Sequence, residues 1–141
     1  FTGGEPLLQL DEISDFIDWT DQQARVCKYQ LETNGSLLSE DVIAFFNLIS
    51  VSPKKQMGTH RLMKLFSDIK AEFKFVIGPD GLEDWQTNMI NQLILSDNFT
   101  IFLQPRSCDQ GATEKCIAMV LDRGSEKLRL SLQQHKIVGV H

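Results

Sequence analysis

The sequence predicts an α/β fold that is built on a mainly parallel sheet. Three observations support this prediction: apolar residues recur at helical spacing in several segments, short extended apolar segments lie between them, and glycine- and proline-containing turns separate the two kinds. Strands that alternate with helices are typical of strand–helix–strand units with right-handed crossovers. The alternation leaves open whether helices cover both faces of an open sheet or only the outside of a curved, barrel-like one.

Amphipathic helices account for four segments of the chain. Ile13, Phe16 and Ile17 show the apolar spacing in the first segment, and Thr59 is the expected N-cap of the second. The third has acidic residues in its first turn, where the helix dipole favours negative charge. The predicted helices are 11–24, 59–73, 82–95 and 111–123.

Strands are expected between these helices. The segment IAFFNLISV is apolar almost throughout, which is typical of a strand covered on both faces. A strand stub is expected at Phe1, and a short strand or extended tail at 135–140. The other predicted strands are 26–32, 43–51, 73–78, 100–104 and 128–132.

Composition and charge argue against several classes of function. The chain is 42% hydrophobic and 23% charged, which is ordinary for one globular domain. A net charge of −5 without a basic block argues against nucleic acid as a partner. No apolar run reaches the roughly 18 residues that span a bilayer, so a membrane partner is not expected.

The three cysteines, Cys27, Cys108 and Cys116, show no CxxC spacing. An odd number of this kind is typical of reduced thiols in a cytoplasmic protein rather than of a disulfide framework. Each is most simply a small buried apolar residue, and Cys108 and Cys116 would need further ligands to hold a metal.

Polar, glycine and proline residues follow the carboxyl end of every predicted strand. In a parallel sheet these ends lie along one edge, where ligands bind. Turn geometry alone explains some of these residues, and it is the simplest interpretation of the Gly-Pro-Asp-Gly turn. The loops expected to meet at this rim are 2–6, 32–36, 52–55, 78–81, 104–107 and 133–136.

Several rim residues suit an anionic or amino-bearing ligand. Lys54 and Arg106 suit a carboxylate or another anion, and Gln104 ends a strand beside them. The glycine pair at 3–4 allows a ligand to approach the backbone closely, so that its N–H groups become donors. Glu5 is suited to accept a hydrogen bond from an amino group.

Other notable residues have simpler interpretations. His135 and Lys136 are candidates for general acid–base groups, and the alternative is an exposed pair at the surface. Trp19 and Trp85 fall on predicted helices and are expected to be packing residues. No GxSxG, HExxH or P-loop motif is present, which disfavours hydrolysis by a conventional site.

Five ordered motifs resemble one known family of enzymes. They are TGGEPLLQ at 2–9, ETNGS at 32–36, VSPK at 51–54, FLQP at 102–105 and LSLQQHK at 130–136. Their order and spacing resemble the 7-carboxy-7-deazaguanine synthase family of radical S-adenosylmethionine (SAM) enzymes, which serves queuosine and deazapurine biosynthesis. The GGE triplet alone is weakly specific, whereas the series covers essentially the whole chain.

The resemblance implies a fold, cofactors and an activity. The fold is a partial (β/α) barrel of the radical SAM type, in a homodimer that binds a [4Fe-4S] cluster, SAM and Mg²⁺. The activity is that of a carbon–nitrogen lyase, in which the cluster reduces SAM to methionine and a 5′-deoxyadenosyl radical. The radical abstracts hydrogen from 6-carboxy-5,6,7,8-tetrahydropterin, and ring contraction with loss of ammonia gives 7-carboxy-7-deazaguanine. SAM is regenerated at the end of the turnover.

The resemblance also implies roles for individual residues. Thr2 is implied to contact the pterin substrate, and so is His141, because the family often ends near its substrate. No catalytic residue and no metal ligand is implied within this chain. The residues implied to bind SAM are Gly4, Glu5, Glu32, Ser52, Pro53, Lys54, Gln104, Pro105, Arg106 and Ser107.

One departure from the family pattern limits what this chain is expected to do. The CxxxCxxC motif that holds the family's cluster is absent, and so is the Mg²⁺-binding threonine that follows it. An iron–sulfur cluster needs its thiolates. We therefore expect residues 1–141 to be the C-terminal portion of a radical SAM core domain whose N-terminal strands are missing, and to be inactive alone.

Two alternatives stay open at this point. The first is another radical SAM enzyme, such as an activating enzyme, against which the LQP and QQHK segments argue. The second is a natural, non-catalytic half-barrel that serves as a binding module. A missing strand beside Phe1 would leave an exposed sheet edge, through which self-association is expected.

Overall fold

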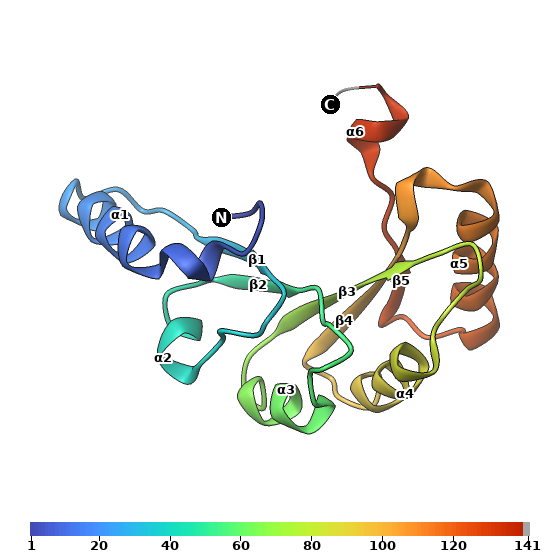
Figure 1. Cartoon of the computed structure of the whole chain (residues 1–141). Helices are drawn as coiled ribbons and strands as arrows, with labels where there is room; N and C mark the ends of the chain where they lie inside the picture. The colour runs from blue at the N-terminus through green and yellow to red at the C-terminus, as the bar shows by residue number, and fades with distance from the viewer. Residues whose placement is uncertain (140–141) are drawn as a thin grey trace.

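The computed structural model describes residues 1–139, apart from the side chains of Cys108, His135 and Ile137, and within these residues the strands form one parallel sheet (Figure 1). The strands are hydrogen-bonded in chain order, β1-β2-β3-β4-β5, and each neighbouring pair is parallel. This confirms the predicted α/β fold class. The strands are β1 (Gln30–Thr33), β2 (Leu48–Val51), β3 (Ala71–Ile77), β4 (Phe99–Pro105) and β5 (Leu128–Leu130).

The helices follow one another around one side of this sheet. Right-handed crossovers that always step in the same direction place their connecting helices on the same face. Figure 1 shows α1 to α5 in an arc around the outer side of the sheet, which favours the curved arrangement over an open sheet covered on both faces. The helical segments are η1 (Pro6–Gln9), α1 (Leu10–Gln22), α2 (Glu40–Ile43), α3 (Thr59–Leu65), α4 (Asp84–Leu93), η2 (Arg106–Cys108), α5 (Gln110–Arg123) and α6 (Gln134–Ile137).

Alternate side chains of β3 and β4 form the core beneath the helices. Phe73, Ile101 and Leu103 are at most 1% exposed, and the ring of Phe73 meets that of Phe99 edge-on, with centroids 5.1 Å apart. Burying a side chain of this size contributes about 1.5–3 kcal/mol. The positions between them, such as Lys74, point to the opposite, open face of the sheet.

Capping residues fix the ends of α4 and α5. At α4 the N-cap Glu83 donates its N–H to Oε1 of Gln86 at 3.0 Å, as in a capping box. At α5 a carboxylate oxygen of Asp109 accepts from the N–H of Ala112 at 2.8 Å, and Gly124 ends the helix in the left-handed conformation. The third and fourth predicted helices are thus confirmed to within two residues.

The predicted strand at 43–51 is wrong over its first half. Ile43 is the last residue of α2, and β2 covers only the last four residues of the segment. Ile43 and Phe46 are buried at helical spacing, and the side-chain oxygen of Asn47 accepts from the N–H of Tyr29 at 2.8 Å. A continuous apolar run does not distinguish a buried strand from a helix end followed by a strand.

The predicted strand at 26–32 is shorter than expected. β1 begins at Gln30, and Val26 is fully exposed. The N–H of Asn47 donates to the carbonyl of Tyr29 at 2.8 Å, so Tyr29 is held by the turn before β2. Strand propensity in this segment is not enough, because a strand also needs a neighbour to pair with.

The predicted helix at 59–73 is too long. α3 ends at Leu65, and residues from Ala71 onward belong to β3 because they pair with β2 on one side and β4 on the other. The N-cap is Gly58 rather than Thr59.

The C-terminal segment is also corrected. Where the sequence predicts a strand or extended tail at 135–140, the short helix α6 is present instead. The N–H of Val138 donates to the carbonyl of Gln134 at 3.0 Å, which is the helical pattern.

An aromatic cluster lies beside β1, at the edge of the sheet. The backbone of Phe1 makes two hydrogen bonds to β1, of 2.6 and 2.9 Å, in the pattern of a parallel neighbour. The ring of Phe1 meets that of Phe16, which in turn meets Trp19. Trp19 is 51% exposed, so its predicted packing role is only half met, whereas Trp85 packs against Phe75 as predicted.

Candidate functional site

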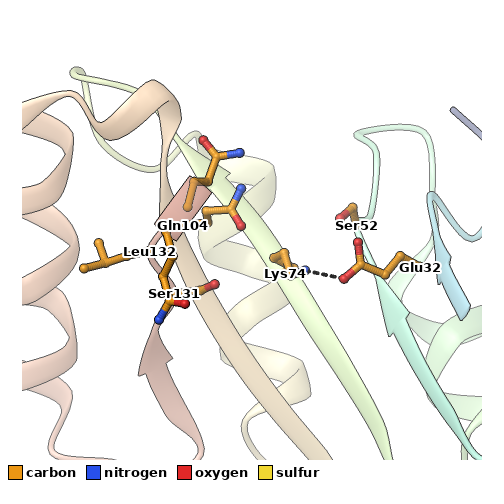
Figure 2. Close-up of a pocket in the computed structure, with 8 residues that line it drawn as sticks. Glu32, Ser52, Lys74, Gln104, Ser131 and Leu132 are labelled. Atoms are coloured by element: carbon orange, nitrogen blue, oxygen red, sulfur yellow. Dashed lines mark hydrogen bonds and ion pairs between the residues drawn. The ribbon is translucent and has the colours of Figure 1, made fainter. Parts of the chain in front are cut away.

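The carboxyl ends of the five strands lie at one edge of the sheet, as the loop pattern predicts, and a hollow of about 560 Å³ opens there. We call it the central hollow. Figure 2 shows Glu32, Ser52, Lys74, Gln104 and Ser131 of this hollow on the open face of the sheet, between β1 on one side and β5 on the other. It is lined by Glu32, Ser52, Lys74, Gln104, Ser131, Leu132, Gln133 and Gln134.

A smaller hollow of about 190 Å³ lies against the GGE loop, and we call it the glycine hollow. Gly4 has a φ of +58°, and no atom lies within 4 Å of the position that its Cβ would occupy, so its backbone is open to a ligand. Glu32 and Ser52 line both hollows, which makes the hollows neighbours at the same rim. The glycine hollow is lined by Thr2, Gly3, Gly4, Glu32, Thr33, Asn34, Ser52 and Lys54.

An ion pair lies between the two hollows. Nζ of Lys74 lies 2.9 Å from Oε1 of Glu32, and the hydroxyl of Thr2 donates to Oε2 of Glu32 at 3.1 Å. β1 and β3 are not neighbours, so the pair reaches over β2, as Figure 2 shows. The hydrogen bond from Lys74 lowers the pKa of the Glu32 carboxyl, although partial burial opposes it. Glu32 is therefore ionised at neutral pH and only accepts hydrogen bonds.

The Ser-Pro-Lys segment continues from β2 to the rim. The N–H of Ser52 donates to the carbonyl of Thr33 at 2.8 Å, which holds the segment against the end of β1. Pro53 is buried, whereas Lys54 is exposed. The proline thus anchors a loop that presents a hydroxyl and an ammonium group to the glycine hollow.

The carboxylate of Glu5 is engaged inside the protein. It accepts from the hydroxyl of Thr33 at 2.6 Å, from the N–H of Asn34 at 2.7 Å and from the N–H of Leu7 at 3.3 Å. These bonds cap η1 and tie the GGE loop to the end of β1. A carboxylate offers about four lone-pair positions, so one remains, and the role of Glu5 toward the SAM amino group stays a prediction.

The end of β4 divides between the hollow and the outer surface. Gln104 lines the central hollow, whereas Pro105 is buried in the strand. Arg106 and Ser107 are exposed on η2 and are not among the described residues that line the two hollows. The structure thus brings Gln104 together with Glu32, and it leaves Arg106 and Ser107 beside the site.

Lys74 is the site residue that motif reasoning missed. It stands on β3 between Phe73 and Phe75, which are both buried in the core. The available signal was a single basic residue in an apolar strand, because alternation places it on the face opposite the core. Four residues of the LSLQQHK motif also line the central hollow without an assigned role, namely Ser131, Leu132, Gln133 and Gln134.

Two histidines with predicted roles at the site cannot be placed relative to it. His141 falls outside the residues that the structure describes, and so does the side chain of His135. Lys136 is exposed on α6. The substrate and acid–base roles of these residues stay predictions.

The cysteines differ in their surroundings. Cys116 is buried in the core, and burial raises its pKa to about 11, as expected for a small apolar residue. Cys27 is exposed, so the prediction that it is buried is wrong. The side chain of Cys108 lies outside the part of the chain that the structure describes. Within the described residues no group of three or more His, Cys, Asp or Glu side chains is placed to hold a metal ion.

A helix that crosses a membrane is both long and apolar. None of the helices within residues 1–139 combines the two properties.

Comparison with known proteins tests the resemblance that the five motifs indicate. The chain is similar to a curated protein named 7-carboxy-7-deazaguanine synthase from Methanospirillum hungatei JF-1, with 29% identity over 143 residues and 99% of this chain covered. The match confirms the predicted resemblance. The chain spans 57% of the length of that relative. No family model matches, and neither does any solved structure.

Proposed function

We propose that this chain forms the SAM-binding part of a radical SAM carbon–nitrogen lyase that converts 6-carboxy-5,6,7,8-tetrahydropterin to 7-carboxy-7-deazaguanine. The observation that carries the proposal is that residues from separate motifs, which the resemblance links to SAM or pterin, line two adjoining hollows. The similarity to the curated relative named 7-carboxy-7-deazaguanine synthase, over 99% of the chain, supports the same reaction class. The residues are Thr2, Gly4, Glu32, Ser52, Lys54 and Gln104.

The polar groups of the rim match the polar groups of SAM in the proposal. The ammonium group of Lys54 and the hydroxyl of Ser52 suit the carboxylate of the methionine part. The ionised carboxylate of Glu32 suits hydroxyl or ammonium donors, because it only accepts. The side-chain amide of Gln104 both donates and accepts, which suits a heterocycle or a hydroxyl.

The other cofactors belong to the proposal for the whole enzyme. When bound, a [4Fe-4S] cluster supplies the electron that cleaves SAM, and Mg²⁺ supplies a positive charge near the substrate. In this proposal the ligands of both come from residues outside this chain. A homodimer is proposed because the resemblance implies one, and a cytoplasmic location because the cysteine pattern is typical of a cytoplasmic protein. Light scattering in solution tests the dimer.

The experiment that tests the proposal is SAM binding, measured by isothermal titration calorimetry. Lys54→Ala is expected to weaken binding about tenfold, because a charge-assisted hydrogen bond is lost. The matched control is Lys55→Ala. Lys55 is the next residue, is also exposed, and lines a different hollow that includes Trp85.

Two outcomes would contradict the proposal. One is that the unsubstituted chain does not bind SAM at all. The other is that both lysine variants lose the same affinity, since this would indicate a general effect of charge rather than a contact at the glycine hollow.

A further inference from the structure

Lys74 supports an inference that deepens the proposed function and rests on it. We infer that Lys74 is a positioning residue, which reaches over β2 and holds the carboxylate of Glu32 in one orientation between the two hollows. Ser52, directly after β2, is the small residue that leaves room for this contact. Neither the five motifs nor the resemblance assigns a role to Lys74.

The distance that the pair spans supports this inference. Neighbouring strands lie about 4.8 Å apart, so two strands with another between them lie about 10 Å apart, and only long side chains meet. Glu32 is in register with Ser50, and Ser50 with Glu72. Lys74 stands two residues further along β3 and therefore reaches back diagonally to Glu32.

The small side chains of β2 leave the space that this contact needs. Ser50 and Ser52 occupy alternate positions on β2 and its continuation, on the side of the sheet that carries Glu32 and Lys74. Ser50 is only 2% exposed, which is the burial expected beneath two long side chains that meet above it. A bulky residue at position 52 would separate the partners.

Stability alone does not explain a lysine at this place. Exposed ion pairs contribute about 0–1 kcal/mol, and a lysine that is held in one orientation also loses side-chain entropy. The second ion pair of the described residues, Lys127 with Asp97, has the same chemistry at 2.7 Å, but Asp97 is 96% exposed and the pair lines neither hollow. The Glu32 side chain is 43% exposed, and it faces both hollows.

Several groups from other elements also act on Glu32. The hydroxyl of Thr2 donates to it, the α-amino group of Phe1 attracts it electrostatically, and Lys54 lines the same glycine hollow. Lys74 has the largest effect among the groups that keep Glu32 ionised. Lys74→Met keeps most of the length of the side chain and removes its charge, so it isolates this contact.

The first test needs no ligand. The Glu32 carboxyl carbon is titrated by NMR in the unsubstituted chain, in Lys74→Met and in Lys74→Arg. The midpoint is expected to rise in Lys74→Met and to stay low in Lys74→Arg, because arginine restores the charge. An unchanged midpoint in Lys74→Met would overturn the inference.

Two further variants make the titration specific. Ser52→Leu is expected to raise the midpoint as well, because it separates the partners without removing either charge. Lys127→Met is the matched control, since it removes an equivalent lysine far from the rim and should leave the Glu32 midpoint unchanged. A rise in Lys127→Met would indicate a general charge effect and would count against the inference.

The second test asks whether Lys74 acts on the ligand through Glu32. SAM affinity is measured for Lys74→Met, Glu32→Gln and the double variant, in a double-mutant cycle. Lys74→Met is expected to weaken binding about tenfold alone and much less in the Glu32→Gln background. Fully additive losses would overturn the inference. If the unsubstituted chain does not bind SAM, the proposed function fails, and the NMR titration still decides whether Lys74 holds Glu32.

Discussion

The two faces of β3 differ in what they contribute to this protein. On the helix-covered face Phe73 and Phe75 are at most 1% exposed and pack with aromatic neighbours. On the open face Lys74, which lies between them in the chain, is paired with Glu32 at the rim. The difference indicates that one face supplies stability and the other lines the central hollow. Substitutions at adjacent positions should therefore separate the two properties.

The largest expected effect is on the covered face. Phe73→Ala is expected to lower the free energy of unfolding by about 3–5 kcal/mol, because it removes a fully buried ring and leaves a cavity between Phe66 and Phe99. Chemical denaturation measures this change. Lys74→Ala on the neighbouring position should cost about 0–1 kcal/mol, and equal losses at the two positions would break the comparison.

Gly35 lies in the loop that follows β1 at the rim, and it packs closely against Val51, a buried residue of β2. Gly35 has a φ of +83°, and a Cβ there would lie 2.7 Å from Cε of Met57 and 2.9 Å from Cγ1 of Val51. Gly35→Ala is expected to cost about 2–3 kcal/mol in the free energy of unfolding, from backbone strain and overpacking together. Denaturation with urea measures the change.

Gly111→Ala provides the control for this effect. The nearest atom to a Cβ at Gly111 is Oδ1 of Asp109 at 3.4 Å, and the residue lies within α5. The same chemical change should there be neutral or stabilise by about 0.5 kcal/mol. A similar loss at both glycines would show that the left-handed backbone at Gly35 is not the cause.

The parts of the fold that sequence predicted well have signals that are local. α5 begins at a capping carboxylate, Asp109, and ends at Gly124, and both signals are readable in the chain. The helix α2, which overlaps the predicted strand at 43–51, has a start signal of the same kind in Ser39. The turn between α2 and β2 has none, because it depends on a contact of Asn47 with Tyr29, which lies 18 residues earlier. Local patterns contain no information about such a partner.

The candidate site shows the same division. Glu32, Ser52 and Lys54 stand in short motifs at strand ends, and the parallel sheet brings them together as predicted. Lys74 belongs to no motif, and its role depends on a contact with a strand that is not its neighbour in the sheet. Glu5 was predicted to face a ligand, but the sequence does not reveal that its carboxylate already has three donors inside the protein.

The smallest expected effect concerns the acid stability of the open face. The pKa of Glu32 is lowered in the folded state, so the pair with Lys74 stabilises the fold above the ordinary carboxyl pKa of about 4.3. This contribution is lost as the pH falls through the lowered folded value. The free energy of unfolding of Lys74→Met should therefore lie at most about 1 kcal/mol below that of the unsubstituted chain at pH 7, since solvent screens the pair.

Denaturation at a series of pH values checks this dependence. The difference between the two chains should shrink once the pH falls below about 4.3 and disappear below the lowered pKa of Glu32. Lys127→Met should follow the same direction, because the hydrogen bond from Lys127 lowers the pKa of Asp97. A difference for Lys74→Met that persisted in strong acid would show that the lysine acts through the packing of its stem, and the open face would then share the structural role of the covered one.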